Sequence, residues 1–191
     1  ESGRGVDPLR EGGRESLVNR GGKRGEGLFG RDRIPRGESL VVGEGYIDAL
    51  MAQANGIENA AATGGSRLTS LQLENAMRRG AKRFILALDN AQSDKAGREG
   101  ALDAIAKIEG AGARAYIAEI PEGYKDPDEA LRSETGALHL KANITAPQSA
   151  AGWAARMLLQ GLDLPASGPV PAILRDQALD AAMGYAAKLK D

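Results

Sequence analysis

The stretch RFILALD (83–89) gives the clearest strand signal in the chain. It is a short apolar run, and a carboxylate, Asp89, closes it. Runs of this length between turn residues are typical of buried strands. Working outward from it, three further runs have the same character, and we expect a strand in each. They are SLVVGEG (39–45), NAAAT (59–63) and ARAYIAEI (113–120).

Helical patterns separate these runs, each recognised by apolar residues at helical spacing. The patterns are Ile47, Leu50, Met51 and Ala54 in the first helix, Leu68 and Leu73 around a Thr69–Gln72 capping box in the second, and Ala101, Ala104, Ile105 and Ile108 in the third. Strands that alternate with helices over short links predict an α/β fold. We therefore expect a mostly parallel four-stranded sheet flanked by helices, with any ligand at the carboxyl ends of the strands.

Composition excludes several classes of site. The chain has 191 residues, no Cys and one His. Disulfides, Cys-ligated zinc, iron–sulfur clusters and thiol nucleophiles are therefore excluded, and a His-dependent triad is disfavoured. No apolar run approaches the roughly 18 residues of a membrane span. The lack of Cys fits a cytoplasmic protein.

The arm that precedes the sheet is basic, and the sheet domain is acidic. Residues 1–36 carry nine Lys or Arg against six Asp or Glu, and residues 37–132 carry 11 against 15. We expect a Gly-rich arm over 1–36, or the remnant of an upstream subdomain, and the α/β domain over 37–134. The N-terminal sequence ESGRGVDPLR has no initiator Met and no apolar leader. It is typical of a cut inside a longer protein.

A helical tail is predicted over 135–191. Residues 151–160 and 174–190 are Ala-rich and amphipathic, and a turn-rich linker joins them. The second helix places one set of residues on a single stripe. This stripe consists of Leu174, Ala178, Ala181, Tyr185 and Leu189.

Carboxylates follow the predicted strands where they end. Glu44 follows the first strand, Asp89 the third, and Asp126 and Asp128 the fourth. Because parallel strands end at one edge of a sheet, these charges would converge and repel one another without a counter-ion. A hard divalent cation such as Mg²⁺ is the natural partner. The alternative is that the acids cap helices, as Asp94 and Asp126 could.

Four segments resemble the Toprim domain, most of all the version in bacterial DNA primases and primase-helicases. They are VVGEGYIDAL (41–50), AATGGSRLTSLQLE (61–74), FILALDNAQSDKAGREGA (84–101) and PEGYKDPDEAL (121–131). GLFGRD (27–32) adds a weaker match to the stretch that leads into Toprim in primases. The resemblance implies a Toprim fold with a Glu after its first strand, an Asp-x-Asp after its third and a DPDE-like element after its fourth.

One position departs from this pattern. The family has its second Asp at position 91, where this chain has Ala91. The family's second Asp is usually followed by x-Ala-Gly-Arg, and Asp94-Lys95-Ala96-Gly97-Arg98 matches that tail. We therefore align Asp94 as the second Asp, after an insertion of about three residues. The alternative is that the second ligand is lost and the site is weakened or inactive.

The resemblance also implies roles for the acids. Glu44 would bind metal or act as general acid or base at a 3′ oxygen. Asp89 and Asp94 would hold Mg²⁺ or Mn²⁺ as catalytic ligands, and Asp126 and Asp128 would complete the cluster. Nucleotidyl transfer depends on such cations more than on covalent protein chemistry. Asp48, one turn after Glu44, is a candidate supporting acid, and no zinc is expected in this part of the protein.

Basic residues just before the domain are the predicted contacts to a template strand, since primases place basic residues there. They are Arg20, Lys23, Arg24, Arg31 and Arg33. Lys95 and Arg98 flank the predicted metal site and could contact phosphate, although plain surface charge is an equal alternative. A further basic cluster, Arg78–Arg83, is better explained by the stabilising effect of cations at a helix C-terminus.

The implied function is the Mg²⁺-dependent catalytic core of a DNA primase. It would make RNA primers from nucleoside triphosphates on single-stranded DNA, within a larger replication protein that works with a replicative helicase. Alone, the chain is expected to be weak or inactive. Two alternatives remain open: DNA cleavage of the nuclease or topoisomerase type, and a degenerate Toprim module that binds nucleic acid without catalysis.

Overall fold

The computed structural model describes residues 25–30, 39–89, 95–160, 162 and 167–188, and it has the expected alternation of strands and helices. The first elements are β1 (Ser39–Gly43), α2 (Tyr46–Ala54), β2 (Ala60–Ala62), α3 (Ser70–Arg78), β3 (Arg83–Leu86), α4 (Lys95–Gly110) and β4 (Arg114–Ile117). The later elements are α5 (Pro127–Leu131), α6 (Glu134–Thr145), β5 (Gln148–Ser149), α7 (Ala150–Gln160) and α8 (Ala172–Lys188).

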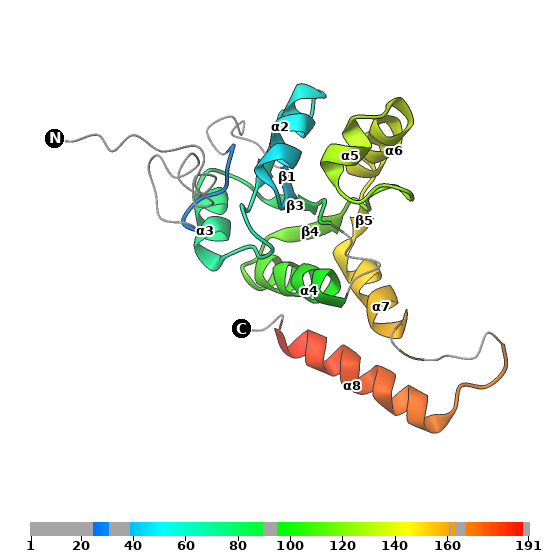
Figure 1. Cartoon of the computed structure of the whole chain (residues 1–191). Helices are drawn as coiled ribbons and strands as arrows, with labels where there is room; N and C mark the ends of the chain where they lie inside the picture. Colours follow the sequence, from blue (N-terminus) through cyan, green and yellow to red (C-terminus); the bar gives the residue numbers. More distant parts are fainter. Residues whose placement is uncertain (1–24, 31–38, 90–94, 161, 163–166, 189–191) are drawn as a thin grey trace, which may run out of the picture.

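Within the described residues the strands form a five-stranded sheet in the order β2-β1-β3-β4-β5 (Figure 1). The pairs β1–β2, β1–β3 and β3–β4 are parallel, which confirms the four expected parallel strands. The fifth strand, β5, is antiparallel to β4 and pairs Gln148 with Ile117. The sequence does not predict β5, because it is two exposed polar residues without an apolar run.

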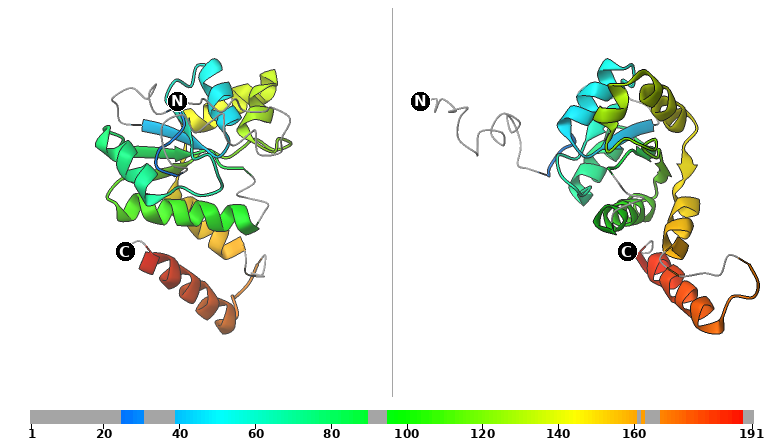
Figure 2. Two further views of the ribbon diagram at one scale, coloured as in Figure 1. Left: turned by 60° about the vertical axis from the view of Figure 1, so that its left-hand side comes forward. Right: turned by 45° about the vertical axis from the view of Figure 1, so that its right-hand side comes forward.

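Helices cover both faces of the sheet (Figures 1 and 2). Successive strand residues point to opposite faces, so Val41 and Ile85 lie in one apolar cluster and Val42 and Phe84 in the other. The first cluster contains residues of α2, α5 and α6. The second contains residues of α3, α4 and α7. This three-layer packing leaves the carboxyl ends of the strands as the place for a site.

Helix α3 begins as its sequence predicts. The Thr69 hydroxyl accepts the backbone N–H of Gln72, and the Gln72 side chain accepts the backbone N–H of Thr69, which completes the capping box. Leu68 and Leu73 are both buried. Gly80 follows with φ +103°, a left-handed conformation that favours glycine at a helix end.

The apolar stripe predicted for α2 is wrong. Its buried residues are Asp48, Ala49 and Ala52, whereas Ile47 and Leu50 are 54% and 44% exposed. The cause is close packing: α2 lies on the short Ala60–Ala62 strand, where small side chains allow a near approach. Asp48 can be buried on this face because backbone N–H groups satisfy its carboxylate.

Residues 25–30, expected to be part of a loose arm, are anchored on the domain. Phe29 and Ala62 exchange backbone hydrogen bonds of 2.8 and 3.1 Å in an antiparallel bridge. Side chains of α3 and its cap donate to carbonyl groups of this segment, Thr69 to Gly25 and Gln72 to Gly27. The segment therefore belongs to the folded domain, because the polar face of α3 supplies donors for its backbone.

The tail is helical, as expected, from α6 onward, apart from β5. In α8, Leu174, Ala178, Ala181 and Tyr185 are half-buried, which confirms the predicted stripe at these positions, while Leu189 lies outside the described residues. Helix α8 packs beside α4 and α7, on the side away from the sheet (Figure 2). Among the described residues, no helix is long and apolar enough to cross a membrane.

Candidate metal centre

Two of the predicted site acids lie on loops that leave the sheet at its carboxyl edge. Glu44 directly follows β1. Asp89 follows β3, whose pairing with β1 continues through the 2.9 Å hydrogen bond from the Ala87 N–H to the Val42 carbonyl. The backbone N–H of Asp89 in turn donates to the carboxylate of Glu44. The loops after β1 and β3 are thereby joined at the point where the two acids emerge.

Asp89 sits in the most unfavourable electrostatic position of the described acids. Its Oδ1 is buried and has no hydrogen-bond partner among the residues that the structure describes. Burial raises the pKa of Asp89 to about 7, with further contributions from the negative charges of Asp48, Glu44 and Asp126, while the positive charge of Lys125 opposes the shift. The burial of this carboxylate and the negative charges around it therefore outweigh the one positive charge that acts on it.

The pKa of Glu44 is also raised. Burial is the largest cause, the charge of Asp48 adds to it, and the hydrogen bond from the backbone of Asp89 acts in the opposite direction. Glu44 is half-buried. Its carboxyl group therefore titrates closer to neutral pH than an exposed Glu does.

Asp48 is a buried acid whose negative charge acts on both Glu44 and Asp89. It is 7% exposed, and its Oδ2 accepts the backbone N–H of Gly45 at 2.8 Å. Its Oδ1 accepts the backbone N–H of Asp128 at 3.1 Å. Burial raises the pKa of Asp48, although these two hydrogen bonds favour its charged form. Its place one turn after Glu44 is the sequence signal for this supporting role.

Asp126 and Asp128 already have partners in the chain. Asp126 caps α5, since its Oδ1 accepts the backbone N–H of Glu129 at 2.8 Å, which is the capping alternative that the sequence left open. Its Oδ2 lies 3.4 Å from Nζ of Lys125. Asp128 accepts from Nε of Arg132 at 3.0 Å. Our sequence reading missed Lys125 and Arg132, although the i,i+4 spacing of Asp128 and Arg132 is typical of a helical ion pair.

These acids fit a divalent cation only in part. Among the described residues, no group of three or more His, Cys, Asp or Glu side chains is arranged to hold a metal ion. Asp94, the predicted second ligand after β3, lies outside those residues. The buried, unpartnered Oδ1 of Asp89 beside Glu44 is nevertheless an anionic oxygen that a cation would satisfy.

The predicted nucleic-acid contacts fall mostly outside the described residues. These are Arg20, Lys23, Arg24, Arg31 and Arg33. Lys95 begins α4; its side chain is 89% exposed and lies 4.0 Å from Glu99. Arg98, one turn further on, is half-buried. Arg78, from the other basic cluster, pairs with Glu74 on its own helix at 3.1 Å.

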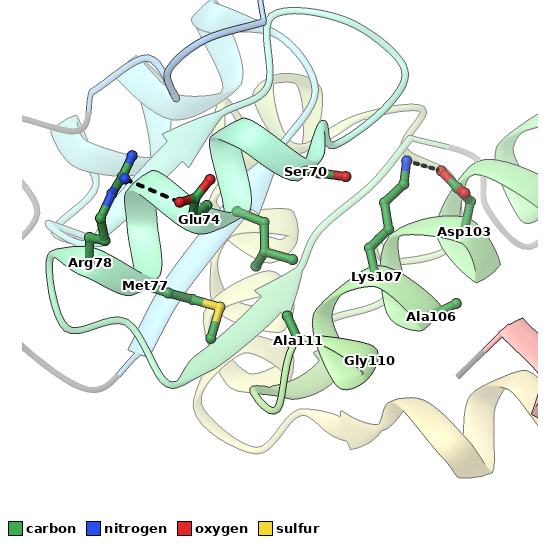
Figure 3. Close-up of a pocket in the computed structure, with 10 residues that line it drawn as sticks. Ser70, Glu74, Met77, Arg78, Asp103, Ala106, Lys107, Gly110 and Ala111 are labelled. Atoms are coloured by element: carbon green, nitrogen blue, oxygen red, sulfur yellow. Dashed lines mark hydrogen bonds and ion pairs between the residues drawn. The ribbon is translucent and has the colours of Figure 1, made fainter. Parts of the chain in front are cut away.

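A pocket of about 750 Å³ lies between α3 and α4 (Figure 3). Leu73, Met77 and Ala106 supply its apolar lining. The ion pairs Glu74–Arg78 and Asp103–Lys107 lie along its two walls. None of the predicted site residues lines it, so we do not assign it to the same chemistry.

Comparisons with known proteins agree with the fold. The profile of a family described as Toprim-like matches residues 41–131, the stretch from β1 to the end of α5. Residues 41–131 therefore form a Toprim domain.

This Toprim domain is of the bacterial DNA primase type. The DNA primase of Deinococcus radiodurans is 34% identical over 113 residues, which cover 57% of this chain and 19% of that protein. The DNA primase of Aquifex aeolicus is 35% identical over 114 residues, 58% of this chain and 22% of that protein. The chain thus spans about a fifth of the length of these curated relatives.

A solved structure extends the likeness to the tail. The RNA polymerase domain of Mycobacterium tuberculosis primase, in complex with a double-stranded DNA oligomer with a 6-nucleotide overhang, matches with a TM-score of 0.64. The two are 26% identical, and the match covers 89% of this chain and 53% of that chain. The match therefore extends well beyond residues 41–131.

Proposed function

We propose that this chain is the catalytic-core part of a DNA primase, which makes RNA primers on single-stranded DNA by Mg²⁺-dependent nucleotidyl transfer. The observation that carries the proposal is the buried, unpartnered Oδ1 of Asp89, coupled electrostatically to Glu44, on a Toprim domain. The primase relatives support the reaction class, and the relative solved with DNA supports a DNA template. The proposed setting is a larger replication protein that works with a replicative helicase.

In this proposal Glu44, Asp89 and Asp94 hold the divalent cation, with Asp126 and Asp128 completing its surroundings. The bound cation supplies electrostatic stabilisation of the charge on the transferred phosphoryl group. Glu44 is proposed to have a second role as general acid or base at the 3′ hydroxyl, and its raised pKa supports this role because it makes the carboxylate a better proton acceptor than an exposed Glu.

The template is proposed to run along the basic arm, over Arg20, Lys23, Arg24, Arg31 and Arg33. Residues 25–30, within this arm, are anchored on α3 and β2. This anchoring supports the proposal, because it holds residues 25–30 on the domain that carries the acids. Lys95 and Arg98 are proposed to add phosphate contacts at the start of α4.

The test is primer synthesis by the full-length protein with Glu44→Gln and Asp89→Asn. Each variant keeps the size and polarity of the side chain and removes its charge. We expect at least a ~100-fold loss of Mg²⁺-dependent synthesis, the order of magnitude for losing one electrostatic group in an active site. Asp103→Asn, which removes an acid of α4 paired with Lys107 at 2.7 Å, is the matched control and should keep full activity. Wild-type synthesis by Asp89→Asn would contradict the proposal.

A second candidate function is a Toprim module that binds nucleic acid without catalysis. Ala91 at the family's second Asp position favours it, and so does the lack of a three-ligand group among the described residues. The two functions differ in their need for the acids. A protein that binds single-stranded DNA equally well with and without Asp89→Asn, and makes no primers in Mg²⁺ or Mn²⁺, would be the non-catalytic module.

A further inference from the structure

Two cations lie over the acids that follow β4. Nζ of Lys125 is 3.4 Å from Oδ2 of Asp126, and Nε of Arg132 is 3.0 Å from Oδ1 of Asp128. The side chains of Lys125 and Arg132 are 72% and 62% exposed, whereas those of Asp126 and Asp128 are 19% and 22% exposed. The acids are therefore largely covered, while the cations face solvent above them.

Both cations interact with more than their nearest partner. The positive charge of Lys125 acts on Asp89, the acid that follows β3. The negative charge of Asp126 acts on Arg132, in addition to that of Asp128. Lys125 and Arg132 thus belong to the same electrostatic unit as the acids of the proposed metal centre. An ordinary surface pair such as Glu74–Arg78 lies on α3, outside this unit.

An anionic substrate needs positive charge at this edge. Glu44, Asp48, Asp89 and Asp126 all contribute negative charge there, and they would repel the phosphates of a nucleotide. Exposed ion pairs stabilise a fold only slightly, so stability alone is a weak reason for two of them at this place. The guanidinium group of Arg132 is also suited to bidentate phosphate binding.

We propose that Lys125 and Arg132 bind the phosphates of the incoming nucleoside triphosphate. Before the substrate arrives they serve as counter-charges for Asp126 and Asp128. The inference rests on the proposed function, because it assumes that a cation occupies the neighbouring carboxylates. It has a distinctive consequence: the two side chains compete with the cation for Asp126 and Asp128, yet they assist the binding of a phosphate.

The test measures these two binding steps separately, with Arg132→Gln and Lys125→Gln in the full chain. Mn²⁺ binding without phosphate is followed by electron paramagnetic resonance, and binding of inorganic triphosphate, with and without saturating Mn²⁺, by calorimetry. For Arg132→Gln we expect triphosphate affinity to fall about 10-fold, the effect of losing a charge-assisted hydrogen bond. Mn²⁺ affinity should stay unchanged or rise up to about 3-fold.

Arg78→Gln is the matched control, because Arg78 also pairs with an acid four residues away, at 3.1 Å, and is 61% exposed. It should change neither affinity. The inference is overturned if Arg132→Gln binds triphosphate as wild type does, or if it loses Mn²⁺ and triphosphate affinity in equal measure, as a merely structural role would require.

Failure of the proposed function has a different signature. If wild-type protein binds no Mn²⁺ but Arg132→Gln still weakens triphosphate binding, the metal-dependent function fails and the phosphate site stands. If Mn²⁺ binds and Asp89→Asn weakens it, while Arg132→Gln leaves triphosphate binding intact, only the phosphate site fails.

Discussion

Asp48 accepts a hydrogen bond from the backbone N–H of Asp128 at 3.1 Å, although 80 residues separate the two along the chain. The other oxygen of the same carboxylate accepts the N–H of Gly45 at 2.8 Å. One buried side chain therefore connects the loop that carries Glu44 to the start of α5. The relative position of the acids after β1 and after β4 depends on this link.

Removing the Asp48 carboxylate should destabilise the fold. Asp48→Ala leaves two backbone N–H groups without their acceptor, so we expect the free energy of unfolding to fall by about 1–3 kcal/mol. Asp48→Asn keeps one acceptor oxygen but turns an NH2 donor toward the second backbone N–H, so it should also lose about 1–3 kcal/mol. Urea unfolding of both variants, with Asp103→Asn as the control, measures the difference. Wild-type stability of either variant would show that these hydrogen bonds do not stabilise the fold.

Asp89 should make the metal-free protein less stable as the pH rises. Its carboxyl pKa is 3.8 in an unfolded chain and about 7 in the fold, so between these values the folded state holds a proton that the unfolded state has lost. The contribution of Asp89 to the free energy of unfolding therefore falls as the pH rises from 3.8 to about 7, and it stays constant at higher pH. Asp89→Asn removes the effect. After allowance for solvent screening of a half-exposed group, we expect the variant to exceed wild type by about 1–2 kcal/mol at pH 8 and by nothing near pH 4.

Thermal unfolding in a chelator over this pH range tests the Asp89 prediction. A stability difference that stays constant with pH would contradict it.

Metal binding at the proposed site should depend on pH in the opposite sense. A cation must displace the proton of Asp89, so Mn²⁺ affinity should rise with pH and level off once the pH exceeds about 7. In Asp89→Asn this dependence should largely disappear, together with most of the affinity. Calorimetric titration of Mn²⁺ at several pH values gives both quantities, and a flat wild-type profile would separate Asp89 from the metal.

The variant Asp94→Asn tests whether Asp94 replaces the family's second Asp, which is absent at Ala91. If Asp94 is the displaced second ligand, primer synthesis should fall about as far as with Asp89→Asn. If Asp94 only caps a helix, Asn caps nearly as well and synthesis should barely change. An active Asp94→Asn enzyme would refute the insertion alignment and leave Glu44 and Asp89 as the proposed ligands.

Gln72 should hold residues 25–30 on the domain. It is 1% exposed and donates to the carbonyls of Gly27 and Thr63 at 3.2 and 2.8 Å. Gln72→Glu keeps the oxygen that accepts the Thr69 N–H but cannot make these two donations, so the unfolding free energy should fall by about 1–3 kcal/mol. Hydrogen exchange of the Phe29 amide should accelerate more than that of Val41 in the interior strand β1. Equal protection of both amides in the variant would exclude this anchoring role.

The sequence predicts the fold best where the determining pattern is local. The Thr69–Gln72 capping box and the stripe of Leu174, Ala178, Ala181 and Tyr185 each depend on neighbouring residues, so spacing alone reveals them. The buried face of α2 could not be predicted in this way. It is set by the packing of α2 on β2 and by the hydrogen bond that Asp48 accepts at the start of α5, and no local pattern contains either contact.

The candidate site shows the same division. Strand-end positions indicate that Glu44 and Asp89 leave the sheet at one edge. They cannot indicate that Asp126 caps α5 and also faces Lys125, since both roles depend on side-chain geometry. Arg132 is visible in the sequence only as a helical ion-pair partner. Its relation to the acid cluster follows from where α5 lies.

The two-residue strand β5 and the single bridge at Phe29 have a consequence for how this domain meets other chains. A long, flat border strand would expose a row of free N–H and C=O groups and invite another strand to pair with it. Here Phe29 bridges β2 at one edge of the sheet, and the two-residue strand β5 forms the other edge beside β4. Within the described residues, neither edge offers a long row of free backbone groups to which a strand of another chain could pair. Another protein would have to bind this domain through side chains on its helices and loops.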